Sequence, residues 1–215
     1  MMIEINNISE NALCCTLPPP AELSKQQRWW AFADSLQALP EIAEVVVGMN
    51  NVTAFTHYGT DLITLSGSLK EIWERTQAGH HQGRHVDIPV VYGGEFGEDL
   101  AEVAAFHGIT TAEVIARHTA PTYTVFMMGF QPGFPYLGGL PENLHTPRRA
   151  VPRASVPAGS VGIGGAQTGM YPFASPGGWQ IIGRTFAPLF QAAAMPPTLL
   201  NAGDTVRFVV ERIEK

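Results

Sequence analysis

The stretch VPAGSVGIGGAQTGMYPFASPGGWQIIGRT, residues 156–185, decides the fold of the second half of the chain. Its apolar residues come in short runs that glycine and proline interrupt every few positions, so a helix is excluded. Because aliphatic and aromatic residues persist through the stretch, it is not a disordered linker. We therefore expect an ordered region of short strands and loops.

Strands are also predicted on both sides of this stretch. From Pro121 onward, apolar and aromatic runs bounded by Gly and Pro predict strands over 122–130, 155–164, 169–175, 178–185 and 198–213. Several short strands of this kind are typical of a barrel or a sandwich.

The residues before Pro121 predict a mixture of helices and strands. Apolar residues at helical spacing predict helices over 22–38, 61–77, 98–108 and 111–119. Thr110 and Glu113 form a capping box before the last of these. Strands are predicted over 2–7, 12–17, 42–49, 51–58 and 86–93. The fold class is thus α+β, with an N-terminal α+β domain over 1–84 and a β domain over 85–215.

The segment AGHHQGRH, residues 78–85, is polar and interrupted by glycine, which predicts a linker. His81 and His85 have the spacing of two metal ligands on a helix, but Gly83 lies between them and a third ligand is missing. We interpret the segment as a solvated loop and predict no metal site.

Composition limits the classes of function. With a net charge of −6, the chain lacks the basic surface that a nucleic-acid partner requires. No segment is apolar enough to cross a bilayer, and the N-terminus has no secretory signal pattern. Cys14 and Cys15 are adjacent, and neighbouring strand residues point to opposite faces, so we expect reduced cysteines that act as apolar filler in a cytoplasmic protein.

Familiar catalytic motifs are missing. The Gly-rich run at 159–169 lacks the Lys-Ser/Thr ending of a P-loop, and no helix follows it as a dinucleotide fold requires. No nucleophile elbow is present, and no lysine occurs between Lys70 and Lys215. Any catalytic contribution is therefore expected from histidine as an acid or base and from arginine as a charge stabiliser.

The segment HTPRRAVPR, residues 145–153, is the strongest polar constellation. His145, Arg148, Arg149 and Arg153 lie within nine residues that two prolines stiffen. Such a loop can direct several guanidinium groups at one carboxylate or phosphate. The alternative, which the sequence leaves open, is that these arginines are surface charges or pair with acidic residues such as Glu142.

Six segments of the chain resemble one family. They are GMNN (48–51), IPVVYGG (88–94), GFQPGFPYLGGLP (129–141), HTPRRAVPR (145–153), the opening stretch (156–185) and GDTVRF (203–208). Together they are similar to the KipI family, which is also described as allophanate hydrolase subunit 1-like. The resemblance covers nearly the whole chain and implies a small N-terminal α+β domain followed by a cyclophilin-like β-barrel domain.

The resemblance also implies a function. It indicates one component of an ATP-dependent 5-oxoprolinase, which cleaves 5-oxo-L-proline to L-glutamate together with two further chains, one of the KipA type and one of the LamB/YcsF type. ATP is used by the complex, and we expect the lone chain to be inactive. Two alternatives stay open: a KipI-type inhibitor of a sensor histidine kinase, and a carboxyltransferase-type partner in urea or allophanate metabolism.

A site hypothesis combines the residues with this implied substrate, which is a small anion with an amide. We predict that Arg148, Arg149 and Arg153 hold anionic groups and that His145 moves a proton or orients a carbonyl. Further ligand contacts are predicted from side-chain amides and from main-chain N–H groups at glycines, namely Gln131, Gln167, Gly159, Gly162, Gly164 and Gly165. For the glutamines, a buried structural role is the alternative.

Overall fold

The computed structural model describes residues 2–79 and 83–215. Its contacts group into two compact units, Met1–His81 and Gln82–Lys215, here called the N-terminal unit and the barrel unit. The exact boundary between the two domains, predicted after residue 84, stays a prediction. The histidine pair considered as metal ligands includes His81, which lies outside the described residues.

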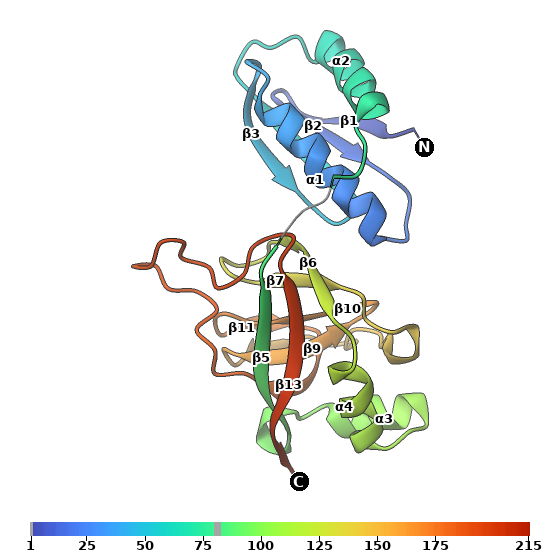
Figure 1. The fold of residues 1–215 in the computed structure, drawn as a ribbon, viewed down its shortest axis with the longest axis vertical. Helices are drawn as coiled ribbons and strands as arrows, with labels where there is room; N and C mark the ends of the chain where they lie inside the picture. The colour runs from blue at the N-terminus through green and yellow to red at the C-terminus, as the bar shows by residue number, and fades with distance from the viewer. Residues whose placement is uncertain (1, 80–82) are drawn as a thin grey trace. The chain divides into compact units, whose positions relative to one another are not determined.

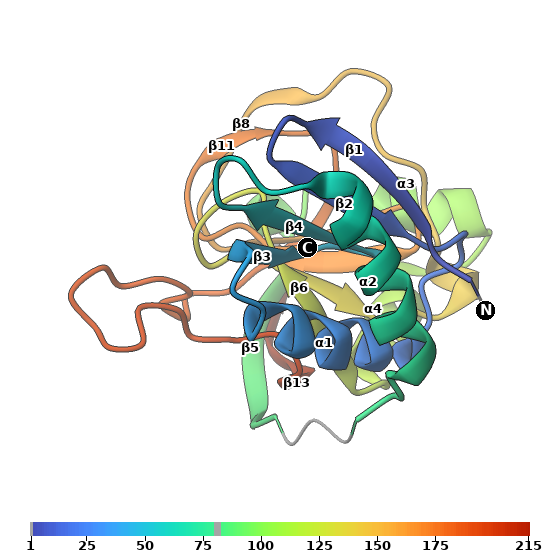
Figure 2. The ribbon, with the colours of Figure 1, turned by 90° about the horizontal axis from the view of Figure 1, so that it is seen from above.

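In the N-terminal unit, two helices pack on one face of a four-stranded antiparallel sheet of order β1-β2-β4-β3 (Figures 1 and 2). The elements are β1 Glu4–Ser9, β2 Ala12–Thr16, α1 Leu23–Gln37, β3 Ile42–Val47, β4 Asn51–Thr56 and α2 Leu62–Arg75. Alternation along β4 turns Val52 and Ala54 toward the helices, where Trp29 and Trp73 lie 4.4 Å apart between ring centroids. Cys15 is buried in this core, and both cysteines are free.

The barrel unit contains a closed barrel of order β10-β7-β6-β13-β5-β12-β9. Its elements are β5 His85–Gly93, η1 Gly94–Phe96, α3 Leu100–His107, α4 Thr111–Thr119, β6 Tyr123–Met128, β7 Pro135–Gly138, η2 Glu142–Leu144, β8 Arg153–Val156, β9 Ser160–Gly164, β10 Gln167–Met170, β11 Ser175–Gly177, β12 Gln180–Arg184 and β13 Thr205–Glu214. The strands pair antiparallel except β5 and β13, which run parallel and lie side by side in Figure 1. The predicted α+β class with a barrel in the second part is thereby confirmed.

Two strands predicted as continuous are each divided. The strand expected over 155–164 breaks into β8 and β9, because a turn closed by Ser160 N–H to the Pro157 carbonyl (3.2 Å) separates them. Gly159 in this turn has φ 82°, which L side chains avoid. The strand expected over 169–175 likewise breaks into β10 and β11, and β11 pairs with β8 outside the barrel.

The predicted capping box before α4 is present in part. The Thr110 hydroxyl accepts the Glu113 main-chain N–H at 3.2 Å, which satisfies one of the free donors of the first turn. The last strand differs from its prediction, because β13 begins at Thr205 rather than at 198. A turn closed by Asp204 N–H to the Asn201 carbonyl precedes it.

A fully buried histidine of α4 contacts the barrel wall. His118 Nδ1 is 2.8 Å from the Tyr92 hydroxyl, and its Nε2 is 2.9 Å from the Thr168 hydroxyl. The Thr168 hydroxyl donates to the Gly162 carbonyl, so it accepts from Nε2–H, and Nδ1 accepts from Tyr92. The neutral ring satisfies both neighbours, and burial lowers the pKa of His118 to about 3.

Within residues 2–79 and 83–215, no helix combines the length and the apolar character that a bilayer span requires.

Candidate functional site

Asp99 joins the start of α3 to the barrel. It occupies the N-cap position of α3 without capping that helix by its side chain, and it is only 1% exposed. Its Oδ2 accepts the Ile181 main-chain N–H at 2.6 Å, and its own N–H donates to the Ile181 carbonyl at 2.8 Å. These bonds fix a buried carboxylate against β12.

Arg149, in the loop after η2, and Arg153, the first residue of β8, converge on this carboxylate. Arg149 Nη1 donates to Asp99 Oδ1 at 2.8 Å. Arg153 binds both oxygens, with Nη1 2.9 Å from Oδ2 and Nη2 2.7 Å from Oδ1. The hydrogen bonds to Asp99 raise the pKa of Arg153 above its usual value. We call Asp99, Arg149 and Arg153 the Asp99 clamp.

The Asp99 clamp involves two of the three arginines that the site hypothesis assigns to a ligand, and their ligand contacts stay a prediction. Arg149 and Arg153 do converge on an anion, but this anion is a carboxylate of the protein itself. The alternative, pairing with acidic residues, therefore describes both of these arginines, with Asp99 in place of Glu142. Arg149 and Arg153 donate to Asp99, and Arg153 also donates to Glu98 at 3.1 Å. Fewer guanidinium donors of these two residues are therefore left for a ligand.

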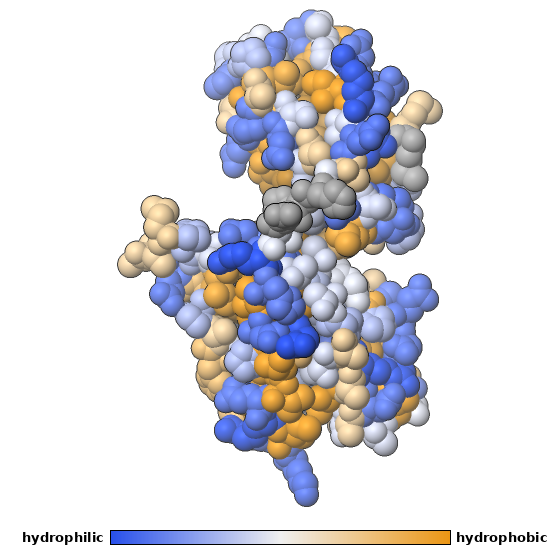
Figure 3. All heavy atoms as spheres, in the orientation of Figure 1, coloured by the Kyte–Doolittle hydropathy of each residue, from blue (hydrophilic) through white to orange (hydrophobic). Residues whose placement is uncertain are grey.

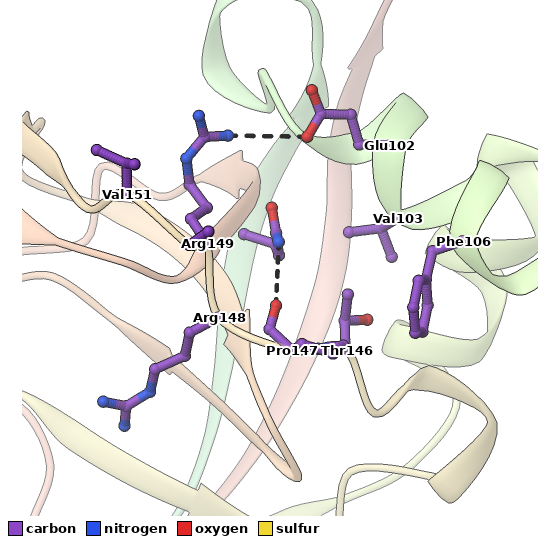
Figure 4. Close-up of a pocket in the computed structure, with 10 residues that line it drawn as sticks. Glu102, Val103, Phe106, Thr146, Pro147, Arg148, Arg149 and Val151 are labelled. Carbon is purple, nitrogen blue, oxygen red and sulfur yellow. Dashed lines mark hydrogen bonds and ion pairs between the residues drawn. The ribbon is translucent and has the colours of Figure 1, made fainter.

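Arg148 points the other way. Figure 4 shows the Arg148 and Arg149 side chains extended in opposite directions from adjacent main-chain positions. The Arg148 guanidinium lies 5.8 Å from the ring centroid of Trp179. Within the described part of the chain it has no carboxylate or carbonyl partner, whereas each of the other arginines has at least one. The guanidinium donors of Arg148 are therefore not engaged by any carboxylate or carbonyl of the described residues, although a buried Nε of Arg149 also lacks a partner among them.

The floor beneath Arg148 is aromatic. Trp179 packs with Phe134, Tyr136 and Tyr171, at 5.5, 6.0 and 6.4 Å between ring centroids. Burial raises the pKa of Tyr136 and of Tyr171, and the positive charge of Arg148 opposes that rise in both. A guanidinium beside aromatic rings, itself without a counter-ion, is a suitable receptor for a small carboxylate with a flat body.

A pocket of about 460 Å³ opens on the other side of the same loop. It is bounded by α3, the loop 146–151 and the start of β12, and its lining is Glu102, Val103, Phe106, Thr146, Pro147, Arg148, Arg149, Ala150, Val151 and Gln180 (Figure 4). Gln180 donates its side-chain amide to the Pro147 carbonyl at 3.0 Å, which holds the loop in place. The volume falls in the range of small-molecule sites, and the lining mixes apolar walls with Arg149, Glu102 and Gln180.

His145 does not line this pocket. Its Nε2 donates to the Leu140 carbonyl at 3.1 Å, and the side chain is half-buried. The ring thus ties the residue that follows η2 to the segment that precedes η2. Its predicted role in proton transfer stays a prediction that this geometry does not support.

The glycines that were predicted to bind a ligand through their main chain have close neighbours within the protein, and that role stays a prediction. Gly162 and Gly164 lie in β9, whose main chain pairs with both β10 and β12. A Cβ on Gly164 would lie 2.6 Å from the Trp179 ring, so the missing side chain makes room for Trp179 and not for a ligand. Gly159 and Gly165 donate their N–H groups to the carbonyls of Tyr171 and Thr146. The main-chain donors predicted for a ligand are occupied at these positions.

Neither predicted glutamine lines the pocket. Gln167 is half-buried and pairs with Gly164 at the start of β10. Gln131 has a buried Oε1 with no hydrogen-bond partner among the described residues. The preceding residue, Phe130, has φ 64° and is 60% exposed, so this loop carries both backbone strain and an unsatisfied acceptor.

Comparison with known proteins places the chain in a family. Residues 3–200 match the model of the carboxyltransferase domain, subdomain C and D. The chain is 59% identical to the B subunit of 5-oxoprolinase from Haemophilus influenzae, with 96% of this chain and 97% of that protein covered. It is 50% identical to the B subunit of 5-oxoprolinase from Escherichia coli O157:H7, with 95% and 94% covered. The solved structure of TTHA0988 is 34% identical with a TM-score of 0.77, and the match spans 93% of this chain but 39% of that longer one.

Proposed function

This chain belongs to the family of carboxyltransferase domains, subdomain C and D, and on that premise we propose that it is the B subunit of an ATP-dependent 5-oxoprolinase. The complex would cleave the lactam of 5-oxo-L-proline to give L-glutamate, with a KipA-type chain and a LamB/YcsF-type chain, in the cytoplasm. The observation that carries the proposal is the similarity, over nearly the full length of both chains, to two proteins named for this role. Those names favour it over a kinase inhibitor or a urea or allophanate carboxyltransferase partner.

The proposed contribution of this chain is to bind the substrate anion. The 5-oxoproline carboxylate pairs with Arg148, whose guanidinium has no acceptor among the described residues, and the lactam ring lies against Tyr136 and Trp179. Arg149 supports this arrangement indirectly, since its bond to Asp99 fixes the main chain from which Arg148 extends.

ATP is assigned to the complex and not to the Gly-rich stretch of this chain. A phosphate cradle needs free main-chain N–H groups, and those of Gly159 and Gly165 are bonded within the protein. Gly162 and Gly164 are packed against Trp179. The residues of this stretch therefore do not fit a phosphate, and we derive no phosphoryl-transfer step from them.

Reconstitution tests the function. The chain is co-expressed with the KipA-type and LamB/YcsF-type chains of the same organism, and glutamate release from 5-oxoproline is measured with and without ATP. We expect ATP-dependent release from the three-chain assembly and none from the lone chain. Release by the lone chain, or an inactive complete assembly whose three chains are all folded, would contradict the proposal.

Substitution of Arg148 tests its role. Loss of a charge-assisted hydrogen bond to a carboxylate costs about 1.5–3 kcal/mol, so Arg148→Ala is expected to raise the KM for 5-oxoproline roughly tenfold to hundredfold in the assembled enzyme. Arg148→Lys keeps the charge but loses the two-pronged geometry, and an intermediate KM is expected. The matched control is Arg212→Ala, since Arg212 is exposed and its carboxylate partner is Glu214. Equal KM values for Arg148→Ala and the control would remove Arg148 from the substrate site.

A further inference from the structure

The barrel unit contains a long region that is almost without charge. Only five of the residues between His118 and Gly203 are Asp, Glu, Lys or Arg, although such residues make up 15% of the whole chain. They are Glu142, Arg148, Arg149, Arg153 and Arg184. Free protein surfaces carry many charges, whereas the centres of protein–protein interfaces are depleted of them. Part of this low charge belongs to buried barrel strands, and the exposed apolar residues Phe130, Phe173 and Met195 lie in the same region.

An arm projects from this region. The chain between β12 and β13 leaves the barrel as a long loop, which both ribbon views show extending away from the barrel (Figures 1 and 2). Its neck is closed by the pairing of Phe190 with Thr198 and by hydrogen bonds from Gln191 N–H to the Pro197 carbonyl (2.7 Å) and from Leu199 N–H to the Leu189 carbonyl (3.0 Å). We call residues 189–199 the arm.

The tip of the arm is apolar and exposed. Met195 is 95% exposed, and the exposed residues on either side of it are alanines and a proline. Figure 3 shows the projection at the left of the barrel unit with the pale orange of apolar residues. Because the neck is held by hydrogen bonds, the tip is presented in one shape, and a partner would bind it without the full cost of ordering a loop.

Two exposed aromatic residues, Phe173 and Phe130, are linked to the arm by packing contacts. Phe190 at the neck contacts Phe173 at 5.6 Å between ring centroids, and Phe173 is 41% exposed. Phe190 also packs against Gly133, in the loop that carries Phe130. The ring centroids of Phe130 and Tyr171 are in turn 6.2 Å apart. The arm, Phe173 and Phe130 are thus linked through Phe190 and Gly133, and together they are here called the apolar strip.

The backbone of Phe130 is a second, independent indication that the apolar strip binds a partner. Its φ of 64° costs a side chain of this kind about 1–2 kcal/mol, yet its ring stays 60% exposed. In the separate chain, an aromatic ring that a strained backbone holds toward solvent contributes little to stability. The strain is offset if the ring is buried when a partner covers it.

We propose that the apolar strip is the docking surface for the chain that carries the remaining subdomains of the carboxyltransferase domain, which is the KipA-type chain of the proposed complex. The inference rests on the proposed function. The matched family model describes subdomains C and D, so a complete domain requires others. In TTHA0988 the matched module accounts for 39% of a longer chain, so that protein contains a further portion beside this module.

The location of the strip ties docking to the substrate site. Tyr171 contacts Phe130 on one side and Trp179 on the other, and Arg148 lies over Trp179. A partner seated on the strip therefore reaches the edge of the aromatic floor below Arg148. Docking then excludes water from a guanidinium that is exposed in the separate chain, and this strengthens its attraction for a carboxylate.

The test is the affinity of the full chain for the purified KipA-type chain of the same organism, measured by isothermal titration calorimetry. Met195→Glu places a charge at the tip and is expected to weaken the Kd by about tenfold or more. Phe130→Asn is expected to weaken it similarly while leaving the Tm unchanged or higher, because asparagine tolerates positive φ. The control is Ile63→Glu on α2 of the N-terminal unit, at a position 84% exposed, with no change of Kd.

The outcomes separate the two proposals. Wild-type affinity in both strip variants would overturn the docking surface and leave the proposed function standing. A wild-type chain that does not bind the KipA-type chain would count against the proposed complex, and the docking surface would fail with it. Self-association of the wild type that Met195→Glu abolishes, seen by sedimentation, would assign the strip to a second copy and also overturn the inference.

Discussion

Asp99→Ala will lower the free energy of unfolding of the barrel unit by about 3 kcal/mol. The Asp99 carboxylate is 1% exposed and accepts hydrogen bonds from Arg149, Arg153 and the Ile181 main chain. Alanine leaves two guanidinium groups facing each other without their counter-ion and strips the Ile181 N–H of its acceptor. Removing the buried partner is costly because the two arginines then keep only the exposed carboxylates of Glu98 and Glu102.

Native-state hydrogen exchange measures this loss, since amides of β9 and β12 report the opening of the barrel unit within the full chain. Glu98→Ala is the matched control. Glu98 contacts Arg153 as well, but its side chain is 57% exposed, and exposed ion pairs contribute at most about 1 kcal/mol. A loss in Asp99→Ala no larger than in Glu98→Ala would show that the clamp does not stabilise the barrel.

Lowering the pH from 7 to 5 will cost the barrel unit about 2 kcal/mol through His118 alone. The folded pKa of about 3 lies below the value of about 6.5 that an unfolded histidine has. As the pH falls below 6.5, the unfolded chain binds a proton that the folded chain excludes, so stability is lost from pH 6.5 down to about 3. The cause is structural, since both ring nitrogens of neutral His118 already have partners in Tyr92 and Thr168.

Carboxylates that lose their charge contribute to the same acid transition, so the histidine term is isolated by difference. His118→Gln keeps a polar side chain but removes the titrating ring. We expect this variant to be less stable at pH 7 and to lose about 2 kcal/mol less than the wild type between pH 7 and 5, as measured by urea unfolding at both pH values. The same loss in both proteins would mean that His118 does not control the acid response.

Local sequence patterns were enough to predict most elements, because their causes are local. Thr110 caps α4 because its hydroxyl accepts the main-chain N–H of Glu113, three residues along the chain. The spacing of apolar residues in α1 and α2 follows from the face that each helix buries. The division of 155–164 into β8 and β9 was missed, although Pro157 and Gly159 interrupt the run at the turn that separates the two strands. The pairing of β8 with β11, outside the barrel, shows the separation in the structure.

The site was harder to predict, because its contacts join distant segments. The arginine-rich loop was identified, but the sequence gives no sign that Asp99 meets Arg149, fifty positions away. Nor does a run of glycines tell whether a ligand or another side chain fills the space above it, and here Trp179 does. Sequence patterns indicated the chemistry of the segment, whereas the direction of each arginine depends on tertiary pairing.

The parallel pairing of β5 with β13 has a consequence during synthesis. The first and the last strand of the barrel lie next to each other along nearly their whole length, from Thr205 beside His85 to Glu214 beside Gly93. A nascent chain therefore cannot close the barrel until β13 has left the ribosome, whatever order the earlier strands adopt. Until then the edges of β5 and β6 that β13 will cover stay open, and this is when the polypeptide most needs protection by chaperones from aggregation.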